Sequence, residues 1–180
     1  MLSDEVYEWL TFDGTKHERI ATVPGMWERT VTVSSASKTF SITGWKIGWT
    51  VGPANLISAI MKVQAFVCFS IATPLQEAVA VALEQSMTSN YFNEFRAEYQ
   101  RRRDFLLQTL RDSGLEPIVP QGSFFILVDI GKVKLPEGAG TEKTITGQNL
   151  HLKDWNFCRW LTTEMGVAAI PVSAFYRCVI

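Results

Sequence analysis

One stretch of this sequence reads Ser34-Ser35-Ala36-Ser37-Lys38-Thr39-Phe40-Ser41-Ile42-Thr43-Gly44-Trp45-Lys46-Ile47-Gly48-Trp49. A β-branched run over residues 30–35 predicts a short strand, and Lys38 follows that strand among small hydroxyl residues. Lys46 stands at the start of a second predicted strand, over residues 45–51, which glycines bracket. Small residues allow a bulky ligand to approach the backbone, and hydroxyls beside a cation suit a phosphate dianion. The stretch therefore indicates a phosphate site next to a lysine whose amine is suited to Schiff-base chemistry.

Strand and helix patterns alternate on both sides of this stretch. Residues 11–29 predict a loop, and helices are predicted from Pro53 as the first helical residue, after Pro74, over 91–113 before Gly114, and over 155–165 before Gly166. Further strands are predicted over 123–129 and 167–170, with a loop over 131–148. The run 78–83 is apolar on all sides, which predicts burial against a sheet or a partner subunit. The alternation predicts an α/β fold, divided near residue 90 into domains 1–90 and 91–180.

The composition excludes several classes of protein. Of the 180 residues, 47% are hydrophobic and 19% are charged, which is enough apolar content for a sizeable core. A net charge of −1 argues against binding to nucleic acid or to a membrane surface by charge alone. Three widely spaced cysteines and two histidines form neither a disulfide framework nor a metal-binding pattern. We expect a reducing compartment, the cytoplasm with the mitochondrion as the alternative, and no metal.

The stretch around Lys38 resembles the cofactor-lysine motif of the class I, fold-type I aminotransferases, which depend on pyridoxal phosphate. Within that family the sequence is most similar to the kynurenine–oxoglutarate aminotransferase and cysteine-S-conjugate β-lyase branch. Three further blocks carry the resemblance, in order along the chain, namely residues 3–9 (Ser-Asp-Glu-Val-Tyr-Glu-Trp), 24–29 (Pro-Gly-Met-Trp-Glu-Arg) and 169–176 (Ala-Ile-Pro-Val-Ser-Ala-Phe-Tyr). The resemblance implies a fold-type I α/β architecture, with 1–90 as the C-terminal half of the large domain and 91–180 as most of the small domain.

The resemblance also implies a role for each of five residues. Lys38 would form the Schiff base with the cofactor and later move the Cα proton, and Asp4 would pair with the protonated pyridine nitrogen. Tyr7 would donate a hydrogen bond to the phenolic oxygen of the cofactor. Ser35 and Lys46 would bind the phosphate. Many class I relatives carry arginine where Lys46 stands, so the charge is kept while the bidentate geometry is lost.

Members of this family are about twice as long as this chain, so the resemblance implies a truncated form. The arginine that holds the substrate carboxylate would lie beyond the matched blocks, and Arg177 does not have the right context for it. Two functions remain open. The chain is either an aminotransferase that moves an amino group from kynurenine, a related aromatic or sulfur amino acid, or glutamine to a 2-oxo acid, or an inactive homologue that acts as an interaction module. Homodimers are expected because these active sites form at a dimer interface.

Other parts of the sequence resemble motifs of different protein classes. Ser35 and Lys38 also fit S-x-x-K of the penicillin-binding proteins, where the lysine lies one helical turn after the serine. We expect no helix between Ser35 and Gly44, and neither Ser-Asp-Asn nor Lys-Thr-Gly follows. Residues 138–144 only loosely resemble a phosphate-binding loop, because their glycine spacing is wrong. Arginines 101–103 predict a solvated, salt-bridged helix face, and Cys68 and Cys158 are predicted to be buried thiols.

Overall fold

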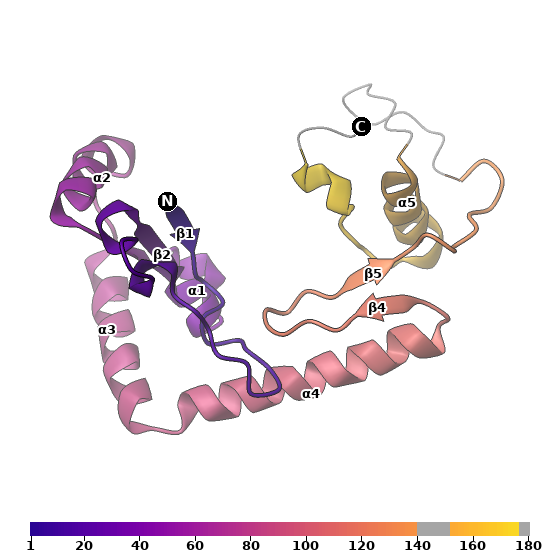
Figure 1. Cartoon of the computed structure of the whole chain (residues 1–180), viewed down its shortest axis with the longest axis horizontal. Helices are drawn as coiled ribbons and strands as arrows, with labels where there is room; N and C mark the ends of the chain where they lie inside the picture. Colours follow the sequence, from indigo (N-terminus) through magenta and orange to yellow (C-terminus); the bar gives the residue numbers. More distant parts are fainter. Residues whose placement is uncertain (140–151, 177–180) are drawn as a thin grey trace. The chain divides into compact units, whose positions relative to one another are not determined.

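The computed structural model describes residues 1–139 and 152–176 (Figure 1). The chain forms two compact units. Unit 1 comprises Met1–Ser113 and Pro117–Leu127, and unit 2 comprises Gly114–Glu116 and Val128–Ile180. The division near residue 90 concerns the domains of the longer family members, and it stays a prediction. No helix in the described ranges is both long and apolar enough to span a membrane.

Unit 1 is built around a three-stranded mixed sheet in the order β1-β2-β3. The strands are β1 (Leu2–Asp4), β2 (Val31–Ser35) and β3 (Gly48–Val51). β1 runs parallel to β2, with Asp4 opposite Val33, and β3 runs antiparallel to β2, with Ser35 opposite Gly48. The predicted strand over 45–51 therefore begins only at Gly48. Because of these directions, the ends of β1 and β2 and the start of β3 share one edge of the sheet.

Short helices lie in the connections between these strands. They are α1 (Ala36–Thr39) and three single-turn 3-10 helices, η1 (Ile20–Thr22), η2 (Trp27–Arg29) and η3 (Thr43–Trp45). The expectation of no helix between Ser35 and Gly44 was wrong. The four residues of α1 are too few to show an apolar period, and the helix depends on the Ser35 hydroxyl, which accepts a hydrogen bond from the Ser37 amide. The S-x-x-K alternative is therefore excluded only because neither Ser-Asp-Asn nor Lys-Thr-Gly follows in the sequence.

Three longer helices follow the sheet, namely α2 (Ala54–Val67), α3 (Thr73–Thr88) and α4 (Tyr91–Asp112). Pro53 is the N-cap of α2 and not its first residue. The helix predicted after Pro74 begins one residue before it, at Thr73, so Pro74 lies in the first turn of α3. The chain leaves α4 through Gly114, whose φ of +77° favours glycine. The α4 helix is tied to the sheet layer because the Tyr91 hydroxyl donates to the Thr39 carbonyl over 2.8 Å.

The core of unit 1 lies between α1, the start of β3 and one face of α3. Its centre is formed by Ala36, Ile47 and Val79. The burial predicted for residues 78–83 holds on one face of the helix, because Val79 is buried while Val81 is half exposed. An amphipathic arrangement results, in which one face of α3 packs on the sheet region and the opposite face is open.

The remaining elements are β4 (Glu116–Ile118), β5 (Leu127–Asp129), α5 (Lys153–Met165) and the 3-10 helix η4 (Val172–Phe175). β4 and β5 pair in a two-stranded sheet, so the predicted strand over 123–129 shrinks to its last three residues. Residues 167–170, all described, form no strand, which corrects that prediction. The α5 helix ends at Gly166 as predicted, and Asp154 at its start accepts a hydrogen bond from the Ser173 amide over 2.8 Å.

Candidate active site

The five residues singled out from the sequence gather at one edge of the three-stranded sheet. Asp4 is the last residue of β1, and Ser35 is the last residue of β2. Lys38 lies in α1 directly after β2, and Lys46 lies two residues before β3 begins. Tyr7 follows β1 in the turn that leads away from the same edge. Parallel strands end on the same side of a sheet, so the topology itself collects these side chains.

Ser35 connects α1, which carries Lys38, to the segment that carries Lys46. Its hydroxyl accepts from the Ser37 amide over 3.1 Å and donates to the Ile47 carbonyl over 3.0 Å. Lys46 is exposed and adopts a left-handed conformation with φ of +56°, which is uncommon for a residue other than glycine. The backbone thus holds the ammonium-bearing residue next to the Ser35 hydroxyl, at the cost of local strain.

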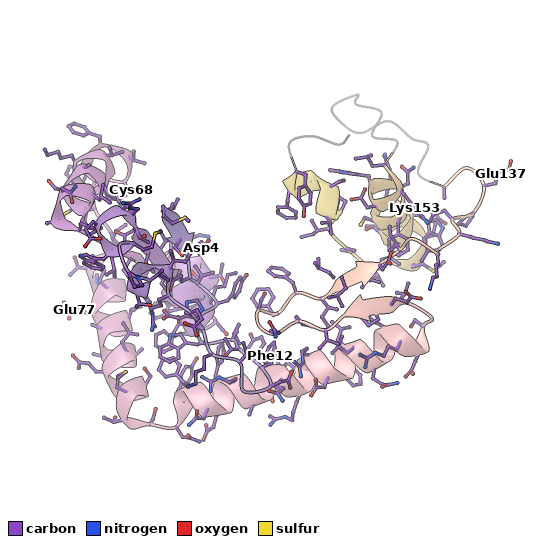
Figure 2. All side chains as sticks on the ribbon, viewed as in Figure 1. Asp4, Phe12, Cys68, Glu77, Glu137 and Lys153 are labelled. Carbon is purple, nitrogen blue, oxygen red and sulfur yellow. The ribbon has the colours of Figure 1, made fainter. Side chains whose placement is uncertain are left out.

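Asp4 and Tyr7 form a second pair within the site. The Asp4 carboxylate accepts a hydrogen bond from the Val6 amide over 3.2 Å, which orients it at the start of the turn. Burial raises the pKa of the Tyr7 phenol, and the negative charge of Asp4 raises it further. The phenol therefore remains a hydrogen-bond donor throughout the neutral range. Figure 2 shows Asp4 on β1 within unit 1.

Tyr7 and Lys38 meet on one aromatic ring that sequence reasoning did not single out. The Phe124 ring lies perpendicular to the Tyr7 ring with centroids 5.2 Å apart, and the Lys38 Nζ lies over the Phe124 ring, 5.3 Å from its centroid. Phe125 also contacts Tyr7, at 5.9 Å. The only trace of this in the sequence is a pair of adjacent aromatic residues within the apolar run that was predicted to be a strand over 123–129.

Two carboxylates beside the site, one buried and one partly buried, were also missed. Glu5 is buried, accepts from the Ser3 hydroxyl over 3.1 Å and lies 2.8 Å from the His17 Nε2. Glu8 accepts from the Ser34 hydroxyl over 3.1 Å and pairs with Arg19. These contacts join the turn that carries Tyr7 to β2 and to the loop that contains His17 and Arg19.

The arginine run on α4 behaves only partly as predicted. Arg101 and Arg102 pair with Glu98 on an exposed helix face, which confirms the expected i,i+4 pair. Arg103 is instead 8% exposed, and its guanidinium donates to Asp13 and to the Pro120 carbonyl, at 3.0 and 3.2 Å. An i,i+4 rule along one helix cannot show a partner that lies on a distant loop.

The cysteines and several other residues named from the sequence lie away from the sheet edge or outside the described residues. Cys158 is buried as predicted, but Cys68, at the C-terminal end of α2, is exposed. Trp9 stacks on Phe92 with ring centroids 3.8 Å apart. Arg177 and most of the loosely phosphate-loop-like segment 138–144 lie outside the described residues.

A shallow, mostly apolar pocket lies between α4 and the segment that carries Phe124. Its lining residues are Tyr99, Arg102, Arg103, Leu106, Pro120, Ser123, Phe124, Phe125 and Ile126. Of the site residues described above, only the two phenylalanines contribute to it. The pocket therefore borders the candidate site through the aromatic pair and does not contain the sheet edge.

Comparison with known proteins finds the same family along nearly the whole chain. The family model "Aminotransferase class I and II" matches residues 1–177. A kynurenine–oxoglutarate transaminase of Dictyostelium discoideum is 56% identical over 98% of this chain, and kynurenine–oxoglutarate transaminase 3 of Homo sapiens is 44% identical over 97%. The chain spans 40% and 38% of the lengths of these two relatives.

Solved structures agree with the sequence relatives. The Escherichia coli protein YbdL, described as having a methionine aminotransferase function, superposes with a TM-score of 0.81 at 37% identity, over 99% of this chain and 43% of its own. The predicted fold-type I α/β class is thereby confirmed. The match extends from the Asp4 block through the Lys38 motif to the Pro171 block, so the resemblance no longer depends on short motifs alone. This chain belongs to the class I and II aminotransferase family.

Proposed function

We propose that this chain carries the cofactor-binding residues of a pyridoxal-phosphate-dependent aminotransferase. The amino donor would be kynurenine, a related aromatic or sulfur amino acid, or glutamine, and the acceptor would be a 2-oxo acid. Support for the reaction class comes from the relatives, two of which are named as kynurenine–oxoglutarate transaminases. The observation that carries the proposal is the collection of Asp4, Tyr7, Ser35, Lys38 and Lys46 at one sheet edge.

The donor set at this edge fits the chemical groups of pyridoxal phosphate. Lys46 and the Ser35 hydroxyl suit the phosphate, since a cation and a hydroxyl satisfy a dianion. Asp4 suits a protonated ring nitrogen, and the Tyr7 phenol, kept protonated by its raised pKa, suits the phenolic oxygen. Lys38 supplies the amine for covalent attachment. When bound, the cofactor would act as the electron sink for cleavage of the substrate Cα–H bond.

Each residue has a defined task in this proposal. Lys38 would release its covalent bond when substrate arrives and then carry the Cα proton on its free amine. Ser35 already donates to the Ile47 carbonyl, so it would exchange that acceptor for a phosphate oxygen. Asp4 would keep a positive charge on the ring nitrogen, and the Val6 amide would hold the carboxylate in place.

Absorbance after addition of pyridoxal phosphate tests the proposal directly. The wild-type chain is expected to develop a visible band, and borohydride reduction followed by peptide mass spectrometry is expected to find the label on Lys38. Lys38→Ala is expected to lose the band, whereas Lys62→Ala, at an exposed lysine on α2, is expected to keep it. Absence of a band in the wild-type chain, or an equal band in Lys38→Ala, would contradict the proposed cofactor lysine.

Turnover is tested separately from cofactor binding. The chain is assayed with kynurenine and 2-oxoglutarate, alone and mixed with a full-length relative. Because it spans 38–43% of the proteins compared above, part of the substrate site is expected to come from elsewhere, so the mixture is expected to turn over faster than the relative alone. No change in rate on mixing would argue against a catalytic contribution by this chain.

A non-catalytic interaction module is the second candidate function. It is favoured by one observation, the large apolar side chains exposed on and just after α2, among them Phe66 at 93% and Phe69 at 91% exposure. Surfaces of this kind mark protein contacts. Co-migration with a full-length relative, with neither a cofactor band nor any gain in turnover, would support this function over the first.

A further inference from the structure

We propose that Phe124 is a positioning residue of the cofactor site, whose ring holds the Lys38 side chain when its amine is not covalently occupied. This rests on the proposed role of Lys38 as the cofactor lysine. In that role the amine becomes free during each turnover and must stay close to the reacting centre. The structure places an aromatic face at the point where that free amine lies.

The geometry is that of a cation–π contact. The Lys38 Nζ lies over the Phe124 ring at 5.3 Å from its centroid, within the distance of about 6 Å at which such attraction operates. The perpendicular Tyr7 ring and the neighbouring Phe125 ring, with centroids 5.2 and 4.7 Å away, limit how the Phe124 ring can turn. One ring therefore contacts both the amine and the phenol that are proposed to serve the cofactor.

Burial does not explain the position of Phe124. The side chain is 42% exposed, so it gains less from leaving water than a core phenylalanine does. It is held instead by the backbone before it, because the Ser123 amide donates to the Leu10 carbonyl over 2.8 Å and the Phe12 amide donates to the Gln121 carbonyl over 2.9 Å. These bonds anchor the segment against the residues that directly follow Tyr7.

Gly122 sets the closeness of that anchor. A Cβ at this position would lie 2.6 Å from the Leu10 carbonyl oxygen, a distance that real Cβ atoms do not reach. The residue is therefore required for the close backbone approach. This close approach of the two backbone segments places the Phe124 ring beside Lys38, as expected of a residue that acts at the site.

The experiment measures how readily Lys38 reacts in the chain without added cofactor. The 180-residue chain is treated with limiting acetic anhydride, and mass spectrometry gives the acetylation rate of Lys38 relative to that of Lys62 in the same molecules. Phe124→Leu is expected to raise this ratio by about two- to five-fold, the equivalent of one partly exposed cation–π contact. Phe124→Tyr keeps an aromatic face and is expected to retain the wild-type ratio.

Phe105→Leu provides the matched control. It makes the same replacement at a phenylalanine on α4 that is 75% exposed, and the ratio is expected to stay unchanged. Should Phe124→Leu lose its helical circular dichroism, Phe124→Met replaces it with the same expectation. An unchanged ratio in the folded leucine or methionine variant, or an equal rise in Phe124→Tyr, would overturn the proposal.

The result is independent of the test of the proposed function. Acetylation uses no cofactor, so a chain that fails to form the visible band contradicts the aminotransferase proposal while the Lys38 ratio still reports on Phe124. Conversely, a normal band together with an unchanged ratio removes Phe124 from the site and leaves Lys38 as the cofactor lysine.

Discussion

At the scale of single residues, the Ser35 hydroxyl combines a structural role with a proposed role in binding. The hydroxyl caps α1 by accepting from the Ser37 amide, and it is proposed to bind the phosphate of the cofactor. Serine is among the best N-cap residues, and threonine retains the acceptor oxygen. In the proposed site, the same atom would link the stability of α1 to binding of the cofactor.

Replacement of Ser35 by alanine is expected to lower the free energy of unfolding by about 1 kcal/mol, because the first turn of α1 loses its cap. It is also expected to weaken binding of pyridoxal phosphate. Urea unfolding and titration of the visible band measure the two effects. Ser35→Thr is the control and is expected to retain most of both. A normal affinity in a folded Ser35→Ala chain would remove the hydroxyl from the phosphate site.

At the scale of elements, Arg103 joins α4 to two distant loops. Its guanidinium donates hydrogen bonds to Asp13, Asp104 and the Pro120 carbonyl. It also lies over the ring of Phe12, 4.8 Å from the ring centroid; Phe12 is labelled in Figure 2. The loops that it joins are also bonded to each other, through the Phe12 amide and the Gln121 carbonyl. Arg103 therefore stabilises the segment that contains Phe124.

Arg103→Met is expected to destabilise the chain by about 1–3 kcal/mol, because hydrogen bonds from a charged donor are lost and the partly buried Pro120 carbonyl is left without this partner. The neighbouring Arg102→Met is expected to cost less than about 1 kcal/mol, since exposed ion pairs contribute little. Chemical denaturation of both variants gives the comparison. Equal destabilisation by the two substitutions would show that the buried contacts of Arg103 carry no special weight.

The same contact predicts a pH dependence. The hydrogen bond from Arg103 holds the pKa of the Asp13 carboxyl below its ordinary value, against a smaller effect of burial. A carboxyl with a lowered native pKa stabilises the fold at pH values above its unfolded pKa, and this contribution is lost as the pH falls through the native pKa. Wild type is therefore expected to be more stable than Asp13→Asn at neutral pH, and the difference is expected to shrink in acid. A difference that grows on acidification would contradict this, and denaturation curves between neutral pH and pH values near 2 measure it.

At the scale of the whole molecule, the exposed apolar surface is the dominant feature. Large apolar side chains on and just after α2 are open to solvent, namely Met61, Val63, Phe66, Val67 and Phe69. Monomeric proteins rarely expose a contiguous patch of this kind. The surface is therefore expected to be covered by association.

The apparent mass of the chain is expected to rise with concentration in light-scattering measurements. The double substitution Phe66→Asp with Phe69→Asp is expected to keep the mass near that of one chain, because charge in the patch opposes its burial. Phe105→Asp, at an exposed phenylalanine on α4, is the control and is expected to associate like the wild type. A wild-type mass that does not change with concentration would show that the patch tolerates water.

Local chemistry was readable in the amino-acid sequence, and contacts between distant segments were not. The β-branched run before Ser35 and the glycines that follow α4 and α5 act within a few residues, so their patterns correctly predicted that strand and those helix ends. The family motif around Lys38 is equally local, and the roles of its residues stay predictions. Phe124 against Lys38 and Arg103 against Asp13 depend on backbone approach between segments far apart in the chain, which leaves no periodic trace. For the same reason the strand predicted over 123–129 was mostly wrong: hydrogen bonds to residues 10–12 hold its first part as a loop, and a strand pattern cannot report where those partners lie.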